Sequence, residues 1–332
     1  MYENMEEKKN FIRKLSYSEN DTKESSYTSQ IDLPENMTIG IEIECIGNKT
    51  KFLKENQSEL FSGWKLKEDK SILPENKDEE GIEIVSDPFL TGSNKMTTEK
   101  IRKIGAILSE FNQYTNDTCG GHIHIGADYL TNVDAWKNLL EIWGNTERIL
   151  YIIGNEKGSI PREKAFKFAS PISKELERML NLGAVILEDE KDLDGFKHEI
   201  GKLYMYRDKS INFENLITGE KNTIEFRLPN GTINPDVWIE NINLFGGIVQ
   251  AAQQLSEIQS KLESERTEEE QEKLDCFNNI VNNDLDEKDQ LEQLLKIVIS
   301  EKRRYIYKQR YVENSELINE NIGIKTKMEN KI

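Results

Sequence analysis

The chain has 332 residues, and its 61 acidic residues outnumber its 44 Lys and Arg residues, which gives a formal net charge of −17. Such an acidic surface repels phosphate backbones and anionic lipid headgroups, so the composition argues against a role on nucleic acids or membrane surfaces. Hydrophobic residues, at 36%, are still numerous enough to form a core.

The sequence shows neither a membrane span nor an export signal. No uninterrupted apolar run approaches the roughly 18–20 residues that a span needs, and the N-terminal stretch is charged and hydroxyl-rich, without the apolar centre of a signal peptide. The three cysteines, Cys45, Cys119 and Cys276, are too scattered for a disulfide framework or a zinc knuckle. We therefore expect a soluble, cytoplasmic protein.

The chain divides into three parts by composition. Residues 1–36 are rich in Glu, Lys, Ser and Asn without a sustained period, which predicts a mobile leader with order beginning near Met37. In residues 37–257, short strand-like runs alternate with longer helical ones. Residues 258–332 form an acidic helical C-terminal extension in which the Glu-rich stretch 263–273 is a solvated helix face or a hinge. We expect the last fifteen residues to be frayed.

Several stretches carry apolar residues at helical spacing. They cover residues 98–114, 134–153, 173–187 and 235–262, with a further helix through Leu291 and Val298. Thr97 and Thr98 are candidate N-caps of the first helix. The second carries Trp136 and Trp143 on one stripe, which is more typical of a core than of a ligand site.

Four short runs, at residues 38–44, 81–85, 121–126 and 223–228, share an alternating pattern. Because successive side chains of a strand point to opposite faces, Ile, Phe and Leu residues share one face of each run. That face predicts strands of an antiparallel sheet that covers a helical core, and hence an α+β fold. The opposite face collects the residues Glu42, Glu44, Glu83, His122, His124, Glu225 and Arg227.

This polar face is either an ordinary solvated sheet surface or a metal centre. Solvated faces usually recruit Thr, Ser, Lys and Tyr, whereas Glu is disfavoured in strands. Carboxylates placed side by side also destabilise each other unless a cation lies between them. The pattern therefore predicts a metal, and a carboxylate-rich set with imidazole favours Mg²⁺ or Mn²⁺ over zinc.

A nucleotide is the natural co-ligand of such a site, because protein-bound Mg²⁺ commonly also binds substrate phosphates. Neither a P-loop nor a dinucleotide fingerprint is present in the sequence, so metal and sheet would hold the nucleotide. Arg227 either binds a carboxylate or phosphate bidentately or forms a salt bridge that orients Glu225.

Four motifs, in this order, resemble the putative amidoligase family, a compact branch of the glutamine synthetase and glutamate–cysteine ligase superfamily. They are Gly40-Ile-Glu-Ile-Glu44, Gly81-Ile-Glu-Ile-Val-Ser-Asp-Pro88, Cys119-Gly-Gly-His-Ile-His124 and Thr223-Ile-Glu-Phe-Arg227. The second departs from the usual Ser-Pro ending of relatives. The resemblance covers about residues 37–247. It implies that residues 37–257 are a catalytic domain with a curved antiparallel sheet, like that of glutamine synthetase, backed by helices.

The resemblance also implies the ligands and the site residues. ATP and two or three Mg²⁺ ions would bind the concave face, and the metal ligands would be Glu42, Glu44, Glu83, His122 and Glu225. His124 would face the nucleotide phosphates, and Arg227 the substrate carboxylate or the transferring phosphoryl group. The family's Asp-x-Ser motif matches at Asp69-Lys-Ser71. For the implied reaction, Asp69 or the adjacent Glu68 is a candidate proton acceptor for the amine. Candidate phosphate contacts are Lys70, Lys95 and Arg207, the last in a segment that also matches through Asn212.

The implied activity is ATP-dependent amide formation between a carboxylate, such as glutamate or a peptide, and an amine, through an acyl phosphate. A metal-dependent hydrolase is the first alternative and requires activity without ATP. The second is a non-catalytic ligase fold that binds a partner, against which the complete ligand set argues. The terminal helices could dock on the core or pair in a homo-oligomer.

Overall fold

The computed structural model describes residues 29–48, 63–86, 90–177, 192–203, 207–218, 221–282 and 285–332. Their strands form one antiparallel sheet in the order β2-β3-β1-β5-β7-β6, with β4 paired to one end of β1. The strands are β1 (Thr38–Gly47), β2 (Trp64–Glu68), β3 (Glu80–Ser86), β4 (Leu90–Thr91), β5 (Gly121–Gly126), β6 (Ile211–Asn212) and β7 (Thr223–Phe226). The four strands predicted from the alternating motifs are neighbours at its centre, which confirms the α+β class with an antiparallel sheet.

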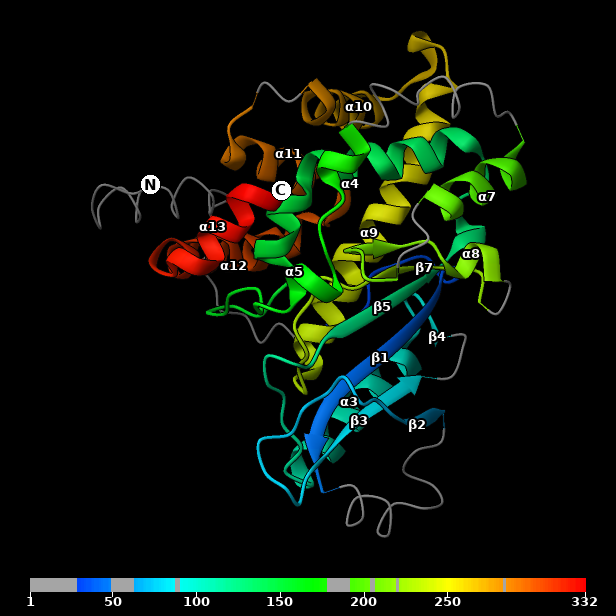
Figure 1. Cartoon of the computed structure of the whole chain (residues 1–332). Helices are drawn as coiled ribbons and strands as arrows, with labels where there is room; N and C mark the ends of the chain where they lie inside the picture. Colours follow the sequence, from blue (N-terminus) through cyan, green and yellow to red (C-terminus); the bar gives the residue numbers. More distant parts are fainter. Residues whose placement is uncertain are drawn as a thin grey trace.

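Helices cover the apolar face of this sheet. The helices before the C-terminal part are α3 (Lys95–Glu110), α4 (Val133–Ile153), α5 (Ala165–Phe168), α7 (Leu193–Leu203), α8 (Asn215–Thr218) and α9 (Pro235–Gln259). Figure 1 shows α9 crossing behind the sheet, and α9 packs against β5, α3 and α4. The isoleucines on the apolar face of the sheet, such as Ile41 and Ile123, are fully buried.

Asparagine caps fix the starts of α3, α4 and α9. The side chains of Asn94, Asn132 and Asn234 each accept a hydrogen bond from a backbone N–H in the first turn of α3, α4 and α9. The prediction that Thr97 or Thr98 caps the first helix was therefore wrong. The Thr97 hydroxyl instead donates to the carbonyl oxygen of Thr91. Of the predicted helix 173–187, residues 173–177 are helical and the remainder lies outside the described residues.

Order begins earlier than the sequence predicted. Ile31 and Leu33, assigned to the leader, are only 5% and 3% exposed and belong to the main core. The side chain of Asn243 in α9 fixes this segment, because it donates to the Gln30 carbonyl and accepts from the Asp32 N–H. Residues 1–28 of the predicted leader lie outside the described residues.

The C-terminal helices pack on the same core. They are α10 (Glu268–Asn282), α11 (Glu287–Val298), α12 (Glu301–Glu320) and α13 (Ile322–Lys331). They lie beside α4, at the end of the molecule away from β2 and β3 (Figure 1). The expected fraying of the last fifteen residues was wrong, because α12 continues to Glu320 and α13 buries Ile324 and Met328. The boundary at residues 257 and 258 stays a prediction.

Buried polar contacts fasten α12 to α9 and α4. The Nη1 atom of Arg303 lies 3.0 Å from Oε1 of Glu240, and the Tyr307 hydroxyl donates to the Glu240 carbonyl oxygen. Arg310 donates to the Ile153 carbonyl oxygen and to the Asn241 side chain. These polar residues of α12 are 3% exposed or less, so they form part of the interior.

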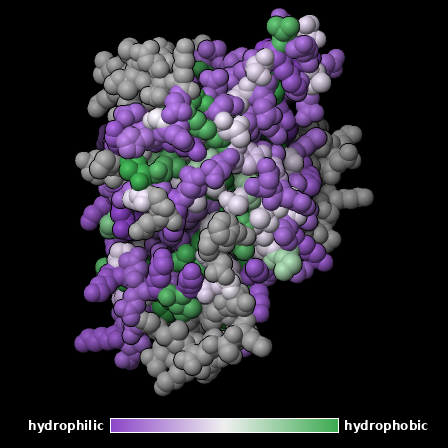
Figure 2. Space-filling model, turned by 90° about the vertical axis from the view of Figure 1, so that its right-hand side faces the viewer, coloured by the Kyte–Doolittle hydropathy of each residue, from purple (hydrophilic) through white to green (hydrophobic). Residues whose placement is uncertain are grey.

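The surface in Figure 2 is consistent with the net charge of −17. Figure 2 shows a mostly hydrophilic face on which apolar residues appear in separate patches. Among the described residues, no helix combines the length and apolar character that crossing a membrane requires.

We expect the buried Arg303–Glu240 pair to be essential for stability. Replacing Arg303 with Met keeps much of the volume but leaves the Glu240 charge buried without its partner, so the free energy of unfolding should fall by about 3–5 kcal/mol. Urea denaturation measures this loss. The control is Lys157→Met, which removes an exposed partner of Glu313 and should cost at most about 1 kcal/mol. Equal losses in the two variants would contradict the prediction.

Candidate metal centre

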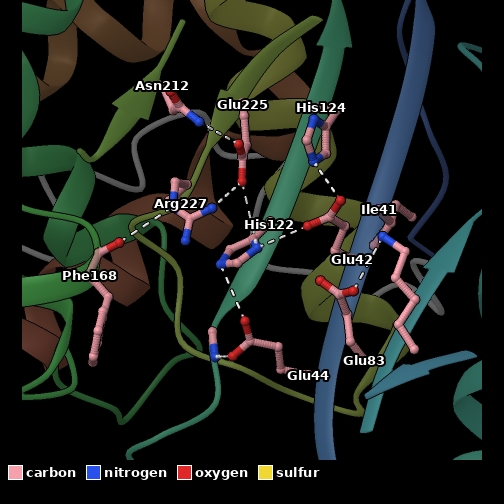
Figure 3. Close-up of polar contacts among 12 residues, drawn as sticks. Ile41, Glu42, Glu44, Glu83, His122, His124, Phe168, Asn212, Glu225 and Arg227 are labelled. Carbon is pink, nitrogen blue, oxygen red and sulfur yellow. Dashed lines mark hydrogen bonds and ion pairs between the residues drawn. The ribbon is translucent and has the colours of Figure 1, made fainter. Parts of the chain in front are cut away.

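The register of the central strands brings the predicted polar residues together. Glu44 on β1 lies opposite Glu83 on β3, Glu42 on β1 opposite His122 on β5, and His124 on β5 opposite Glu225 on β7. Figure 3 shows these side chains pointing toward one another from the four strands. We call these six residues the carboxylate–histidine cluster.

Two glycines make room for the cluster. Gly40 lies opposite His124, and a Cβ atom at position 40 would lie 3.2 Å from the Cβ atom of His124. At the other end, the N–H of Gly120 donates to Oε2 of Glu44 at 2.5 Å. The backbone thus helps to fix one carboxylate, and the missing side chain at position 40 leaves space for the His124 ring.

His122 lies among three carboxylates. Its Nδ1 atom is 3.2 Å from Oε2 of Glu42 and 3.6 Å from Oε1 of Glu225, and its Nε2 atom is 3.6 Å from Oε1 of Glu44. All four side chains are buried. Carboxylates buried this deeply and this close together need compensating positive charge, and an imidazolium at His122 or a metal ion between them would supply it.

The cluster contains two overlapping groups of possible metal ligands. Glu42, Glu83 and His122 form one, and Glu42, His124 and Glu225 form the other; within each group the ligand atoms lie within 4.8 Å of one another. Glu42 is common to both. Carboxylate oxygens with a single imidazole per group suit Mg²⁺ or Mn²⁺, so the donor set fits a divalent cation.

The environment of His124 also fits a bound cation or phosphate. Its Nδ1 atom is 3.1 Å from the Thr223 hydroxyl, which holds the ring in place as the outer partners of metal-binding histidines do. Its buried Nε2 atom lies 3.2 Å from Oε1 of Glu42 but has no aligned hydrogen-bond partner. The second ring nitrogen is therefore left available to a ligand.

The cluster shifts the pKa values of its carboxyl groups in different directions. Burial raises the pKa of Glu42, but the close contacts with His122 and His124 and their positive charge outweigh it, and the net pKa lies well below the usual range. Burial and the negative charge of Glu42 raise the pKa of Glu83. Burial opposes ionisation of Glu225 as well, but His124 and Arg227 lower its pKa overall. A cation near Glu83 would offset the negative charge of Glu42 and stabilise the ionised form of Glu83.

Arg227 makes the salt bridge that was one of its two predicted roles. Its Nη1 atom contacts Oε1 of Glu225, and its Nε–H donates to the Phe168 carbonyl oxygen at 3.3 Å (Figure 3). The other oxygen of Glu225 accepts from Nδ2 of Asn212 at 2.7 Å. Glu225 is thus fixed from both sides.

The other predicted site residues lie away from the cluster: Asp69 and Lys70 follow the edge strand β2, Arg207 precedes the edge strand β6, and Lys95 begins α3. Asp69 follows β2, and its carboxylate accepts from the N–H of Ser71 at 2.7 Å. Lys70 and Arg207 are exposed in turns, and the Lys95 side chain, 91% exposed, pairs with Glu99. Within the described part of the chain, none of the contacts of these four residues joins them to the carboxylate–histidine cluster.

Two lysines lie beside carboxylates of the cluster, and neither was predicted from the sequence. Nζ of Lys221 lies 2.9 Å from Oε1 of Glu42, and Nζ of Lys67 lies 3.4 Å from Oε2 of Glu83. Lys221 precedes Thr223, Glu225 and Arg227 in the same alternation, so extending that strand backwards would have found it. Lys67 lies opposite Glu83, which is apparent only once β2 is known to pair with β3.

The sequence model of one protein family, described as "Putative amidoligase enzyme", matches residues 35–249. The match extends from just before β1 into α9 and contains every member of the carboxylate–histidine cluster. No curated protein matches the chain.

We expect Mn²⁺ binding to depend on Glu42 more than on Glu83, because only Glu42 belongs to both ligand groups. Glu42→Gln should weaken two sites and Glu83→Gln one, each by at least about tenfold, since even outer partners of metal ligands contribute about 10–100-fold. Titration followed by electron paramagnetic resonance measures both. Glu141→Gln, a part-buried carboxyl in α4, is the control. Unchanged binding in Glu42→Gln would exclude this cluster as the metal centre.

Removing the Lys221 ammonium should tighten Mn²⁺ binding. The ammonium competes with a cation for Oε1 of Glu42, and a half-exposed ion pair contributes up to about 1 kcal/mol, so Lys221→Met should lower the Mn²⁺ dissociation constant by up to about fivefold. Lys157→Met serves as the control. Weaker binding in Lys221→Met would show that the lysine assists the cation instead of competing with it.

Proposed function

The chain belongs to the putative amidoligase family, whose membership indicates a ligase, and on that premise we propose that it is an ATP-dependent carboxylate–amine ligase. The observation that carries the proposal is the carboxylate–histidine cluster, with two possible ligand groups that share Glu42 on one face of the sheet. A face of this kind suits phosphoryl transfer, which depends mainly on positioning and charge neutralisation.

We infer that the fold is that of a glutamine synthetase catalytic domain. The supporting features are an antiparallel sheet, its helices on the apolar face and its acidic residues on the other. In this arrangement ATP would lie on the polar face of β3, β1, β5 and β7. The family match ends within α9, so we assign the reaction to the part of the chain before α10.

Five residues would hold Mg²⁺ or Mn²⁺: Glu42, Glu44, Glu83, His122 and Glu225. The bound ions would neutralise the triphosphate and draw negative charge from the transferred group. His124 would face the phosphates through its Nε2 atom, and the same position makes it a possible ligand in the group with Glu42 and Glu225.

The proposed reaction has two steps. A carboxylate oxygen of the acid attacks the γ-phosphorus of ATP, the bond to the β,γ-bridging oxygen breaks, and an acyl phosphate and ADP result. The amine nitrogen then attacks the acyl carbon, inorganic phosphate leaves, and the nitrogen loses a proton. Arg227 would bind the carboxylate or the phosphoryl group, because its guanidinium lies beside Glu225 on the polar face.

The remaining assignments lie on segments at the two edges of the sheet. We assign proton acceptance from the amine to Asp69, and phosphate contacts to Lys70, both in the turn after β2, and to Arg207 before β6. Glutamate or a peptide would serve as the acid.

Calorimetry of ATP binding in the presence of Mg²⁺ tests the proposal. We expect the wild-type protein to bind, and Glu42→Gln and Glu225→Gln to weaken binding by at least about tenfold, while Glu141→Gln binds normally. Acid and amine together should then be needed for phosphate release. A wild-type protein that binds no ATP with Mg²⁺ or Mn²⁺ would overturn the ligase. Hydrolysis without ATP would favour the metal-dependent hydrolase. The absence of both ligase and hydrolase activity would favour the partner-binding protein.

A further inference from the structure

Arg162 is a buried cation that the reaction proposed above does not use. It lies in the segment between α4 and α5 and is only 5% exposed. Its backbone N–H donates to the Asn230 side chain at 2.9 Å, and its Nη1 atom donates to the Thr118 carbonyl oxygen at 3.1 Å. Its Nε–H is buried without a hydrogen-bond partner in the described part of the chain.

The guanidinium of Arg162 lies at the start of β5, beside the metal centre. A Cβ atom at Gly120 would lie 2.4 Å from Nη2 of Arg162 and 3.1 Å from Nε2 of His122. The N–H of the same Gly120 donates to Glu44. The absence of a side chain at position 120 therefore gives the guanidinium its place next to these two residues.

This cation is poorly compensated. Among the described residues, no carboxylate oxygen lies within the 4.0 Å of an ion pair with Arg162, and burial lowers the pKa of its guanidinium. Glu44 offsets part of this effect, whereas the positive charge of Arg227 adds to it. A buried charge without a paired counter-charge is strongly unfavourable.

Arg227 follows β7 and contacts Oε1 of Glu225, and this oxygen lies 3.6 Å from Nδ1 of His122, so Arg227 lies near the same histidine as Arg162. Arg227 is 8% exposed, and its guanidinium already contacts Glu225 and the Phe168 carbonyl oxygen. Two buried guanidiniums that repel each other, one with an unpaired N–H, form an environment that an anion would stabilise. Their planar N–H groups match the paired oxygens of a carboxylate or a phosphate.

We propose that Arg162 and Arg227 together bind one oxyanion at the Glu44–His122 end of the carboxylate–histidine cluster. The oxyanion is either the carboxylate of the acid substrate or the transferred phosphoryl group. The proposal rests on the proposed ligase function for the source of the anion, but the arginine pair itself is testable without nucleotide.

The test compares the wild-type protein with Arg162→Met, Arg162→Lys and Gly120→Ala. Gly120→Ala keeps the charge but displaces the guanidinium, and it is a second variant in case Arg162→Met does not fold. Arg148→Met, which removes a partly exposed partner of Glu287, is the control. Thermal unfolding is recorded for each variant.

Calorimetry measures inorganic phosphate and L-glutamate, each titrated into the protein alone and into its complex with ADP and Mg²⁺. We expect Arg162→Met and Gly120→Ala to weaken the binding of at least one anion by about ten- to a hundredfold, and Arg162→Lys to weaken it by less. ADP binding should be unchanged in Arg162→Met and Arg162→Lys. If the variants lose phosphate binding, the anion bound by the arginine pair is the transferred phosphoryl group. If they lose glutamate binding, it is the carboxylate of the acid substrate.

Three results would overturn the proposed arginine pair. They are a wild-type protein that binds neither anion, Arg162 variants that bind both anions as the wild type does, and Arg162 variants that lose ADP binding as much as anion binding. If the wild-type protein binds phosphate but no nucleotide, the ligase proposal fails while an effect of Arg162→Met still supports the arginine pair.

Discussion

The burial of several carboxylates on the central strands of one sheet is the constraint that shapes this protein. Glu42, Glu44 and Glu225 are each no more than 7% exposed, although like charges at this spacing repel each other strongly. The protein compensates with two histidines between the strands and with Arg227 and Lys221 at the border. Such an arrangement is more easily explained by a cationic ligand than by stability, because apolar residues at these positions would pack at least as well.

The surrounding structure fixes the positions of these charged side chains. Glycines stand where a side chain would displace His124 or Arg162, and the Ile41 N–H donates to the Ser86 hydroxyl across β1 and β3. The apolar side of β5 packs on α9, and the two central strands β1 and β5 are buried on both faces over most of their length. A one-residue shift in register would place isoleucines among the carboxylates and carboxylates in the core, which fixes the register strongly.

The sequence predicts the centre of the fold better than its borders, for physical reasons. Alternation assigns Glu42 and Glu225 to one face without knowledge of the partner strands, because it depends only on local geometry. Arg162 and Lys67 join the site through long-range pairing that no local pattern encodes. Helix α12 lies in the extension that was predicted to be helical, but the sequence did not delimit it. Its buried face contains Arg303, Tyr307 and Arg310, which a search for apolar periodicity reads as a surface.

The core and the site are connected through another buried carboxylate, Glu147 of α4. Its oxygens accept from the N–H groups of Ile172 and Ser173 and from the Ser210 hydroxyl, and burial raises its pKa. Ser210 in turn offers its carbonyl oxygen to the Arg227 N–H, so the position of Arg227 depends on a contact that starts in the helical layer. Helices that share a core with α4, including α12, therefore support the polar face of the sheet, although none of the cluster residues lies on them.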